Sequence, residues 1–175
     1  MKKNRIAIYG GAFDPPHIGH VATCDWILRE NLADQIWVIP CFLHPFGKPL
    51  SRFEDRLSMC EAAFPSKKIV VSHVEQELGG VSYTLRTLQH LQATHPNIEF
   101  SLILGEDNKD KASIWKHFDT IQKLASIIWI PRGTHSSIPN VSSSVVRQAV
   151  KRRWPFASMI PRAVAEHIIR FGLYR

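Results

Sequence analysis

The sequence predicts a doubly wound α/β fold, in which a single parallel sheet carries helices on both of its faces. Short runs rich in isoleucine and valine, apolar on both sides, are typical of strands buried between two layers. Helix-length segments separate these runs, and such alternation favours a parallel sheet. The chain of 175 residues is long enough for one domain with its own core, which we expect to span residues 1–175.

Five segments fit the strand pattern, and they cover residues 6–9, 35–40, 68–72, 99–104 and 127–130. In a doubly wound sheet, ligands bind beyond the carboxyl ends of the strands, where the strand order reverses. We therefore expect the functional site among the segments that follow the first, second and fourth strands. These segments are Gly10-Gly11, residues 40–49 and residues 105–107.

Five further segments have the spacing of helices, and they cover residues 18–30, 53–64, 83–94, 143–151 and 162–171. The first is expected to bury an apolar stripe made of Val21, Trp26, Ile27 and Leu28. Ser51 and Glu54 match the capping-box pattern at the start of the second. Gly172 is expected to cap the last helix at its C-terminus.

The composition limits the classes of partner. A net charge of +7 and a pI near 9.6 indicate anionic partners. A phosphate-rich small ligand fits this charge as well as nucleic acid does, and no nucleic-acid motif appears. No apolar run approaches the roughly 18–20 residues that span a bilayer, and no signal-peptide core is present, so we expect a cytoplasmic protein. Cys24, Cys41 and Cys60 lack the spacing of a disulfide framework or a zinc site.

The segment after the first strand has the composition of a phosphate site. Gly10 and Gly11 allow a sharp turn that exposes backbone N–H groups, and Ala12 and Phe13 continue it. His17 and His20 follow at the expected start of a helix, where the helix dipole favours an anion. Imidazoles placed there can stabilise charge that develops during phosphoryl transfer. Two structural histidines or a zinc site are the alternatives, although no third metal ligand has matching spacing.

A second phosphate-binding pattern lies near the end of the chain. Ser142, Ser143 and Ser144 precede a helix, and Arg147 follows one turn later. Free amides of a first helical turn together with a bidentate guanidinium can hold a polyphosphate. Lys48 is a candidate for a further positive charge. The alternatives are a serine N-cap, a surface arginine and an exposed loop lysine.

The remaining candidates suit the recognition of a nucleoside. Asp107 is placed to hold a ribose hydroxyl, and Trp115 could stack on a planar ring. Ser82, Tyr83 and Thr84 could line a pocket with amides and hydroxyls. Helix N-caps for Asp107 and for residues 82–84, and a core position for Trp115, remain open. The sequence contains neither a Walker-type loop nor the Gly-x-Gly-x-x-Gly pattern of dinucleotide oxidoreductases.

Together these segments resemble the His-x-Gly-His nucleotidyltransferase superfamily, and within it the bacterial nicotinate-mononucleotide adenylyltransferase family. The resemblance runs nearly end to end, and the matching segments are residues 10–20, 53–57, 82–88, 105–115, 141–147 and 171–174. It implies a Rossmann-like nucleotidyltransferase fold and the transfer of AMP from ATP to nicotinate mononucleotide. The products are nicotinate adenine dinucleotide and pyrophosphate, in NAD biosynthesis.

The resemblance also implies roles for individual residues. His17, His20 and Arg147 would be catalytic. The expected ATP-binding residues are Gly10, Gly11, Ala12, Phe13, Lys48, Ser142, Ser143 and Ser144. The expected acceptor-binding residues are Ser82, Tyr83, Thr84, Asp107 and Trp115. No side chain is expected to bind metal, because ATP would carry the Mg²⁺. ATP and a pyridine mononucleotide are the expected partners, with neither nucleic acid nor membrane, and the oligomeric state is left open, a homo-oligomer included.

The chain departs from the family at three positions near the acceptor side. Lys48 follows His44-Pro45-Phe46-Gly47, where the family has Pro-Pro-His-Lys. Arg86 stands where aspartate is frequent, and Lys116 where an aromatic residue is common. Adenylyl transfer is therefore better supported than the identity of the acceptor. Nicotinamide mononucleotide or phosphopantetheine as acceptor, and a non-catalytic nucleotide-binding regulator, are the alternatives.

Overall fold

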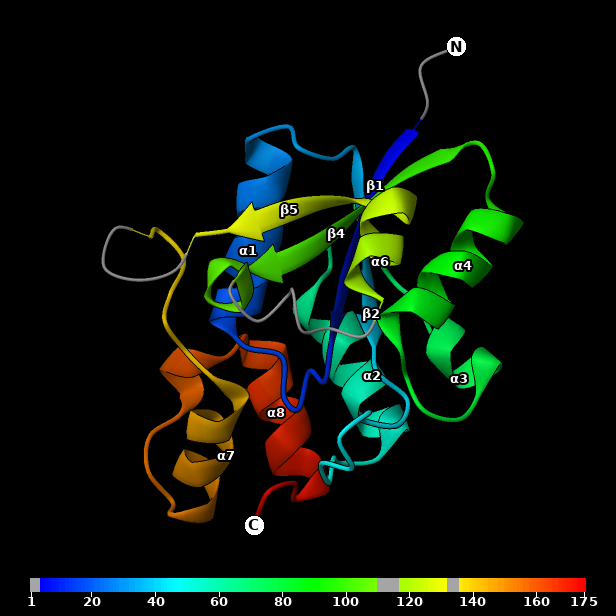
Figure 1. The fold of residues 1–175 in the computed structure, drawn as a ribbon. Coiled ribbons are helices and arrows are strands. Elements are labelled where there is room, and N and C mark those ends of the chain that lie inside the picture. Colours follow the sequence, from blue (N-terminus) through cyan, green and yellow to red (C-terminus); the bar gives the residue numbers. More distant parts are fainter. Residues whose placement is uncertain (1–3, 110–116, 132–135) are drawn as a thin grey trace.

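A five-stranded parallel sheet forms the centre of the computed structural model, which describes residues 4–109, 117–131 and 136–175 (Figure 1). Its strands lie in the order β3-β2-β1-β4-β5 and all pair in parallel. They are β1 (Asn4–Gly11), β2 (Gln35–Pro40), β3 (Ile69–Val71), β4 (Ile98–Gly105) and β5 (Ser126–Ile130). The order reverses between β1 and β4, so the predicted doubly wound α/β fold is confirmed.

Helices cover both faces of the sheet. Their bounds are α1 (Ile18–Arg29), α2 (Phe53–Ala63), α3 (Val74–Leu78), α4 (Thr84–Thr94), α6 (Phe118–Leu124), α7 (Ser143–Lys151) and α8 (Arg162–Phe171), with 3-10 turns η1 (Glu106–Asn108) and η2 (Ala157–Met159). One core cluster joins α1, α2, α7 and α8 to the sheet, and a second joins α3, α4 and α6 to its other face. No helix of the described segments is long and apolar enough to cross a membrane.

The strand β1 supplies both clusters because its side chains alternate between the two faces. Ala7 and Tyr9 belong to the first cluster, and Ile6 and Ile8 to the second. All four are buried, as the apolar pattern on both sides of this strand predicts. Cys24, Cys41 and Cys60 are buried free thiols, and burial raises the pKa of each.

The predicted stripe of α1 packs against the core, although only Ile27 of it is fully buried, and the predicted cap of α2 is wrong. The face of α1 that is fully buried consists of Gly19, Thr23, Cys24 and Ile27, while Val21, Trp26 and Leu28 lie half-buried at its edges. The capping box of Ser51 and Glu54 does not form, because α2 begins at Phe53 and its N-cap is Arg52. The predicted cap at Gly172 is confirmed by its left-handed backbone, with φ of 63°.

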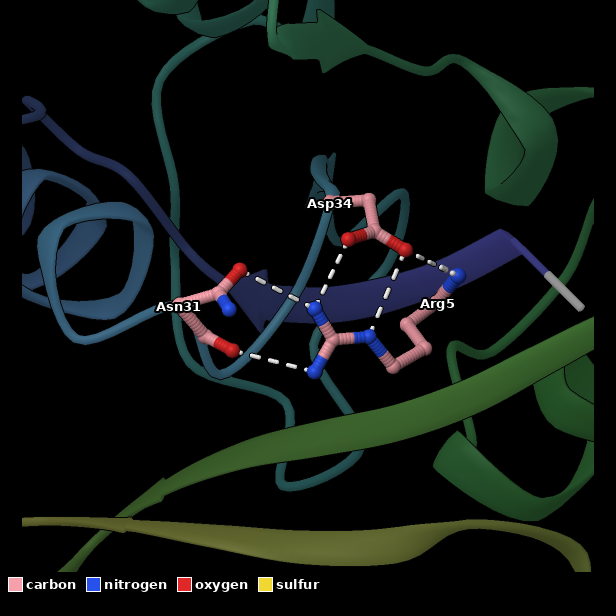
Figure 2. A network of polar contacts seen from close by, with 3 residues as sticks. All are labelled: Arg5, Asn31 and Asp34. Atoms are coloured by element: carbon pink, nitrogen blue, oxygen red, sulfur yellow. Dashed lines mark hydrogen bonds and ion pairs between the residues drawn. The ribbon is translucent and has the colours of Figure 1, made fainter. Parts of the chain in front are cut away.

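At the amino end of the central strand β1, Arg5 forms a network of polar contacts with Asn31 and Asp34 (Figure 2). The Arg5 guanidinium donates to both carboxylate oxygens of Asp34, at 2.7 and 3.3 Å, and the Arg5 backbone N–H donates to the same carboxylate at 3.0 Å. The guanidinium also donates to the carbonyl and the side-chain oxygen of Asn31, at 3.0 and 3.1 Å. This network fastens β1 to the connection between α1 and β2.

Candidate active site

The carboxyl end of β1 leads through Gly10 and Gly11 into a loop that ends at His17, the N-cap of α1. The rings of His17 and His20 stack with centroids 3.6 Å apart and planes 23° apart. The His17 backbone N–H donates to Nδ1 of His20 at 3.1 Å. Because Nδ1 accepts this bond, the proton of a neutral His20 lies on Nε2. His20 is therefore held as a donor at the N-terminus of the helix.

Asp14 anchors this loop from three directions. Its side chain is 2% exposed and accepts from the Tyr174 hydroxyl at 2.7 Å and from the Ser51 backbone N–H at 3.2 Å. Its backbone carbonyl accepts from the Arg147 guanidinium at 2.6 Å. Burial and the hydrogen bond to Asp14 raise the pKa of Tyr174, so the phenol stays protonated as the donor.

The first turn of α7 meets the same loop, although the two segments are more than 120 residues apart in sequence. The Ser143 hydroxyl donates to the carbonyl of Pro15 at 2.9 Å. Ser142 is the N-cap of α7 and accepts from the Val145 backbone N–H at 3.3 Å. Arg147 also donates to the Ser144 hydroxyl at 3.3 Å. The structure thus brings Arg147 and the three serines beside the loop that carries His17 and His20.

Gly19 allows α1 to approach the segment that precedes α7. A Cβ at Gly19 would lie 2.8 Å from the carbonyl oxygen of Pro139 and 3.1 Å from Nδ1 of His17. Backbone and ring atoms at these distances cannot give way without moving the site. The glycine of the His-x-Gly-His motif is therefore required by close packing.

Arg56 is a structural residue of the site that the sequence argument missed. Its side chain is 1% exposed. The guanidinium donates to the carbonyls of Ala12 at 2.9 Å, Cys41 at 2.8 Å and Ser51 at 3.0 Å. It therefore fastens the loop after β1 to the loop after β2. A sequence signal exists, because Arg56 lies one helical turn before the buried Cys60 and shares its face of α2.

A cavity of about 240 Å³ opens beside the loop, at the carboxyl edge where the sequence predicts a site. Gly10, Gly11 and Ala12 line one side, and Ser82 and Thr84 line another. The backbone of Gly10 is open toward it, since a Cβ built there would meet nothing within 4 Å. The loop after β1 and part of the expected acceptor set therefore line the same cavity.

Glu75, on the short helix α3, forms a buried polar wall of this cavity. One carboxylate oxygen accepts from the Thr87 hydroxyl at 3.0 Å, and the other accepts from the Phe42 backbone N–H at 3.3 Å. The same N–H donates to the Ser82 hydroxyl at 2.7 Å. Burial raises the pKa of Glu75, and these hydrogen bonds oppose the shift. This network fixes Ser82, the first residue of the Ser-Tyr-Thr segment.

The other candidates lie as follows. Lys48 is exposed and is not among the residues that line the cavity. Tyr83 is exposed as the N-cap of α4, and Asp107 is exposed in η1. Trp115 and the variant position Lys116 lie outside the described residues.

The loop after β2 contributes His44, which was not among the candidates. His44 lines the cavity, and its Nδ1 accepts from the Phe46 backbone N–H at 3.2 Å. Partial burial and the positive charge of Lys48 lower the pKa of His44. A neutral His44 whose Nδ1 is occupied carries its proton on Nε2.

Comparisons with known proteins identify the family of this chain. The model of the Cytidylyltransferase-like family matches residues 8–149. A probable nicotinate-nucleotide adenylyltransferase of Anaeromyxobacter dehalogenans is 38% identical over 97% of this chain and 96% of its own. One from Myxococcus xanthus is 32% identical over 97% and 94%. The fold matches Plasmodium falciparum nicotinic acid mononucleotide adenylyltransferase complexed with NaAD, with a TM-score of 0.81, 24% identity and coverage of 98% and 97%. The chain belongs to the cytidylyltransferase-like family and, within it, to the nicotinate-nucleotide adenylyltransferase family.

Proposed function

We propose that this enzyme transfers the AMP group of ATP to the 5′-phosphate of nicotinate mononucleotide. Nicotinate adenine dinucleotide and pyrophosphate are the products. The observation that carries the proposal is the continuity of the site at Gly10 and Gly11. These glycines line the cavity on one side and lead on the other to the stacked His17 and His20 and to Arg147. Full-length relatives carrying this activity in their names support it.

In this reaction an oxygen of the acceptor phosphate attacks the α-phosphorus of ATP. A new P–O bond forms, the bond from the α-phosphorus to the bridging oxygen breaks, and pyrophosphate leaves. No protein nucleophile is required, so catalysis consists of alignment and charge stabilisation. His20, held with its proton on Nε2, would donate to a non-bridging oxygen as negative charge builds up. His17 would fix the orientation of that ring through the stacking contact.

The β- and γ-phosphates would be held by the α7 end of the site. The Ser143 and Ser144 amides begin a nine-residue helix, so its dipole favours an anion there. Arg147 has five N–H donors and uses two of its nitrogens on Asp14 and Ser144, which leaves donors for phosphate oxygens. Lys48 is proposed as a long-range positive charge on its exposed loop.

Mg²⁺ is proposed to arrive on the ATP phosphates, where it would neutralise charge on the leaving pyrophosphate. The residues present fit this arrangement. Within the described ranges, no three His, Cys, Asp or Glu side chains gather to hold a metal ion. Both carboxylate oxygens of Asp14, the acidic residue of the motif, accept hydrogen bonds from the protein. We propose that phosphate oxygens of ATP, and not a cage of protein side chains, hold most of the ion's coordination sites.

The mononucleotide would occupy the cavity beyond Gly10 and Gly11. Ser82 and Thr84 line that cavity, and we propose that Tyr83, Asp107 and Trp115 complete its recognition. The walls next to Ser82 are fixed by the hydrogen bonds of Glu75 and Phe42. The acceptor's 5′-phosphate would then lie at the glycines, next to the α-phosphorus.

The test is the release of pyrophosphate from ATP with a panel of acceptors: nicotinate mononucleotide, nicotinamide mononucleotide and phosphopantetheine. We expect the largest kcat/KM with nicotinate mononucleotide, and identification of the dinucleotide by mass spectrometry. No turnover with either pyridine mononucleotide would refute the acceptor. Calorimetry that shows ATP binding without product from any acceptor would identify a non-catalytic nucleotide-binding protein instead.

A further inference from the structure

The described part of the chain contains a second cavity, of about 520 Å³, between the C-terminal ends of α7 and α8. In Figure 1 both helices point toward the end of the molecule where the C-terminus lies. The cavity is lined by cationic, aromatic and aliphatic side chains, among them Lys151, Arg153, Trp154, Phe156, Ile168 and Arg175. Its volume lies within the range of roughly 300–1,000 Å³ that is usual for small-molecule sites. None of these residues takes part in the proposed adenylyl transfer.

Positive charge is concentrated around this cavity. Residues 142–175 contain seven of the 22 lysines and arginines but only one of the 15 acidic residues, Glu166. Glu166 is engaged by Arg162 at 2.8 Å on the exposed face of α8. Cationic side chains therefore outnumber acidic ones in this segment, and the excess favours an anion as the ligand of the cavity.

An exposed aromatic side chain lies beside these charges. Trp154 is 53% exposed, although it lines the cavity. The Arg152 guanidinium lies 4.8 Å from the centroid of its ring. Such a contact orients the indole and adds a fourth positive charge. With Phe156 nearby in the lining, the cavity offers aromatic surface for a planar ring.

The position of Arg153 is unusual for an arginine. The N–H groups of Trp154 and Arg153 donate to the carbonyls of Ala149 at 2.8 Å and Val150 at 3.0 Å, which is a Schellman motif that ends α7. The motif needs one residue with a left-handed backbone, which is usually glycine. Here Arg153 occupies that position, with φ of 57°. Arginine pays a conformational cost at this position that glycine avoids, and its side chain lines the cavity.

We propose that this cavity is a second nucleotide site, which binds a nucleoside diphosphate or a similar small polyanion with a planar base. Lys151, Arg153 and Arg175 would hold the phosphates, and Trp154 and Phe156 would contact the base. The cations gather around one cavity, which favours a small molecule over a nucleic-acid strand, since a strand would need basic residues along an extended track. The site lies on α7, one helical turn beyond the catalytic Arg147, and does not depend on the acceptor of the main reaction.

The test uses the indole N–H signal of Trp154 in a ¹⁵N NMR spectrum, assigned by its loss in Trp154→Phe. We expect ADP to shift this signal saturably. In the double variant Lys151→Glu, Arg153→Glu, the affinity for ADP obtained from this titration should fall at least tenfold. The matched control Lys67→Glu, Lys68→Glu reverses two exposed charges between α2 and β3. It should leave the affinity for ADP unchanged.

A second variant separates binding from folding. Arg153→Gly should keep or raise Tm, because glycine suits the left-handed position, and should still weaken ADP binding severalfold. Wild-type ADP affinity in Arg153→Gly would refute the role of the guanidinium. Inorganic pyrophosphate should bind about tenfold more weakly than ADP, which is the contribution of one stacked base.

Three other outcomes would overturn the proposal. A Trp154 signal that does not move with millimolar ADP would mean that no such site exists. Pyrophosphate binding as tightly as ADP would exclude recognition of the base. An oligothymidylate strand that saturates the signal at lower concentration than ADP would reassign the surface to nucleic acid.

Discussion

The two ends of β1 differ in which residues make the polar contacts around them. At its amino end, Arg5 forms an ion pair with Asp34 of the connection between α1 and β2 (Figure 2). At its carboxyl end, Gly10 and Gly11 carry no side chain, and the polar contacts that fix the following loop come from distant elements. At the amino end, a side chain of β1 itself makes the polar contacts, to Asn31 and Asp34, whereas at the carboxyl end the glycines have no side chain to make them and side chains of distant elements hold the loop. We therefore expect substitutions at the two ends to differ in how strongly they affect activity.

The largest expected effect is at the carboxyl end, from His20→Ala. Removing one preorganised donor to a developing charge typically costs about 10²–10³ in kcat. We expect a loss of that size in pyrophosphate release, with little change in the affinity for ATP. The matched control is His95→Ala, since His95 is also half-buried and ring-packed but lies beside the amino end of β4. Equal losses in kcat and ATP affinity would show that His20 only binds.

A pair of glycine variants tests why this end is open. In Gly19→Ala the new methyl would lie 2.8 Å from the Pro139 carbonyl, so the helix and His17 must shift. Overpacking of this kind costs typically about 1–3 kcal/mol, and we expect a lower Tm together with at least about tenfold slower turnover. Gly10→Ala has room for its methyl and should keep the wild-type Tm while ATP binding weakens. If Gly19→Ala keeps both Tm and turnover, the close approach is not required.

Glu75 allows a pH-dependent test of the cavity wall. Burial raises its pKa, so the folded state binds the proton more tightly than the unfolded state does. Its contribution to stability must therefore fall as the pH rises above its ordinary value of 4.5. Glu75→Gln removes this ionisation. In urea unfolding, the free energy of unfolding of the variant, relative to that of wild type, should therefore increase from pH 4.5 to pH 7.5. A difference that is independent of pH would contradict the raised pKa.

The smallest effect is expected at the amino end, from Asp34→Ala. The pair with Arg5 is partly exposed, and exposed pairs contribute little to stability. We expect a small decrease in Tm, measured by thermal denaturation, and an unchanged kcat/KM for ATP. A large loss of activity in this variant would mean that the two ends of β1 are coupled.

Much of the fold could be predicted because it follows from local pattern. The helices at 143–151 and 162–171 begin and end at the predicted residues, and the strands differ by at most two residues at either end. The short helices α3 and α6 were not predicted, since five and seven residues are too few for a clear helical period. The predicted stripe of α1 packs against the core, but hydropathy alone does not indicate that Gly19 and Thr23 join its fully buried face.

The long-range partners of the site could not be predicted in the same way. The motif residues His17, His20 and Arg147 were candidates, but nothing local shows that Asp14 meets Tyr174 across 160 positions. Ser51 failed as a helix cap because its backbone is used elsewhere, accepting from Arg56 and donating to Asp14. Such choices are decided by tertiary contacts, which override local signals.

The anchoring of Asp14 also has a consequence for the order in which the molecule comes apart. Tyr174, Arg147 and Ser143 all belong to the C-terminal segment, so detachment of that segment removes three supports of the loop at once while the strands remain paired. Local opening of this kind needs less free energy than global unfolding. On mild denaturation, the amides of α7 and α8 should therefore begin to exchange under the conditions at which activity is lost. The amides of β1 and β4 should exchange only under stronger denaturation. If exchange in α7 and α8 and loss of activity coincide in this way, loss of activity on mild denaturation reports undocking of the C-terminal segment.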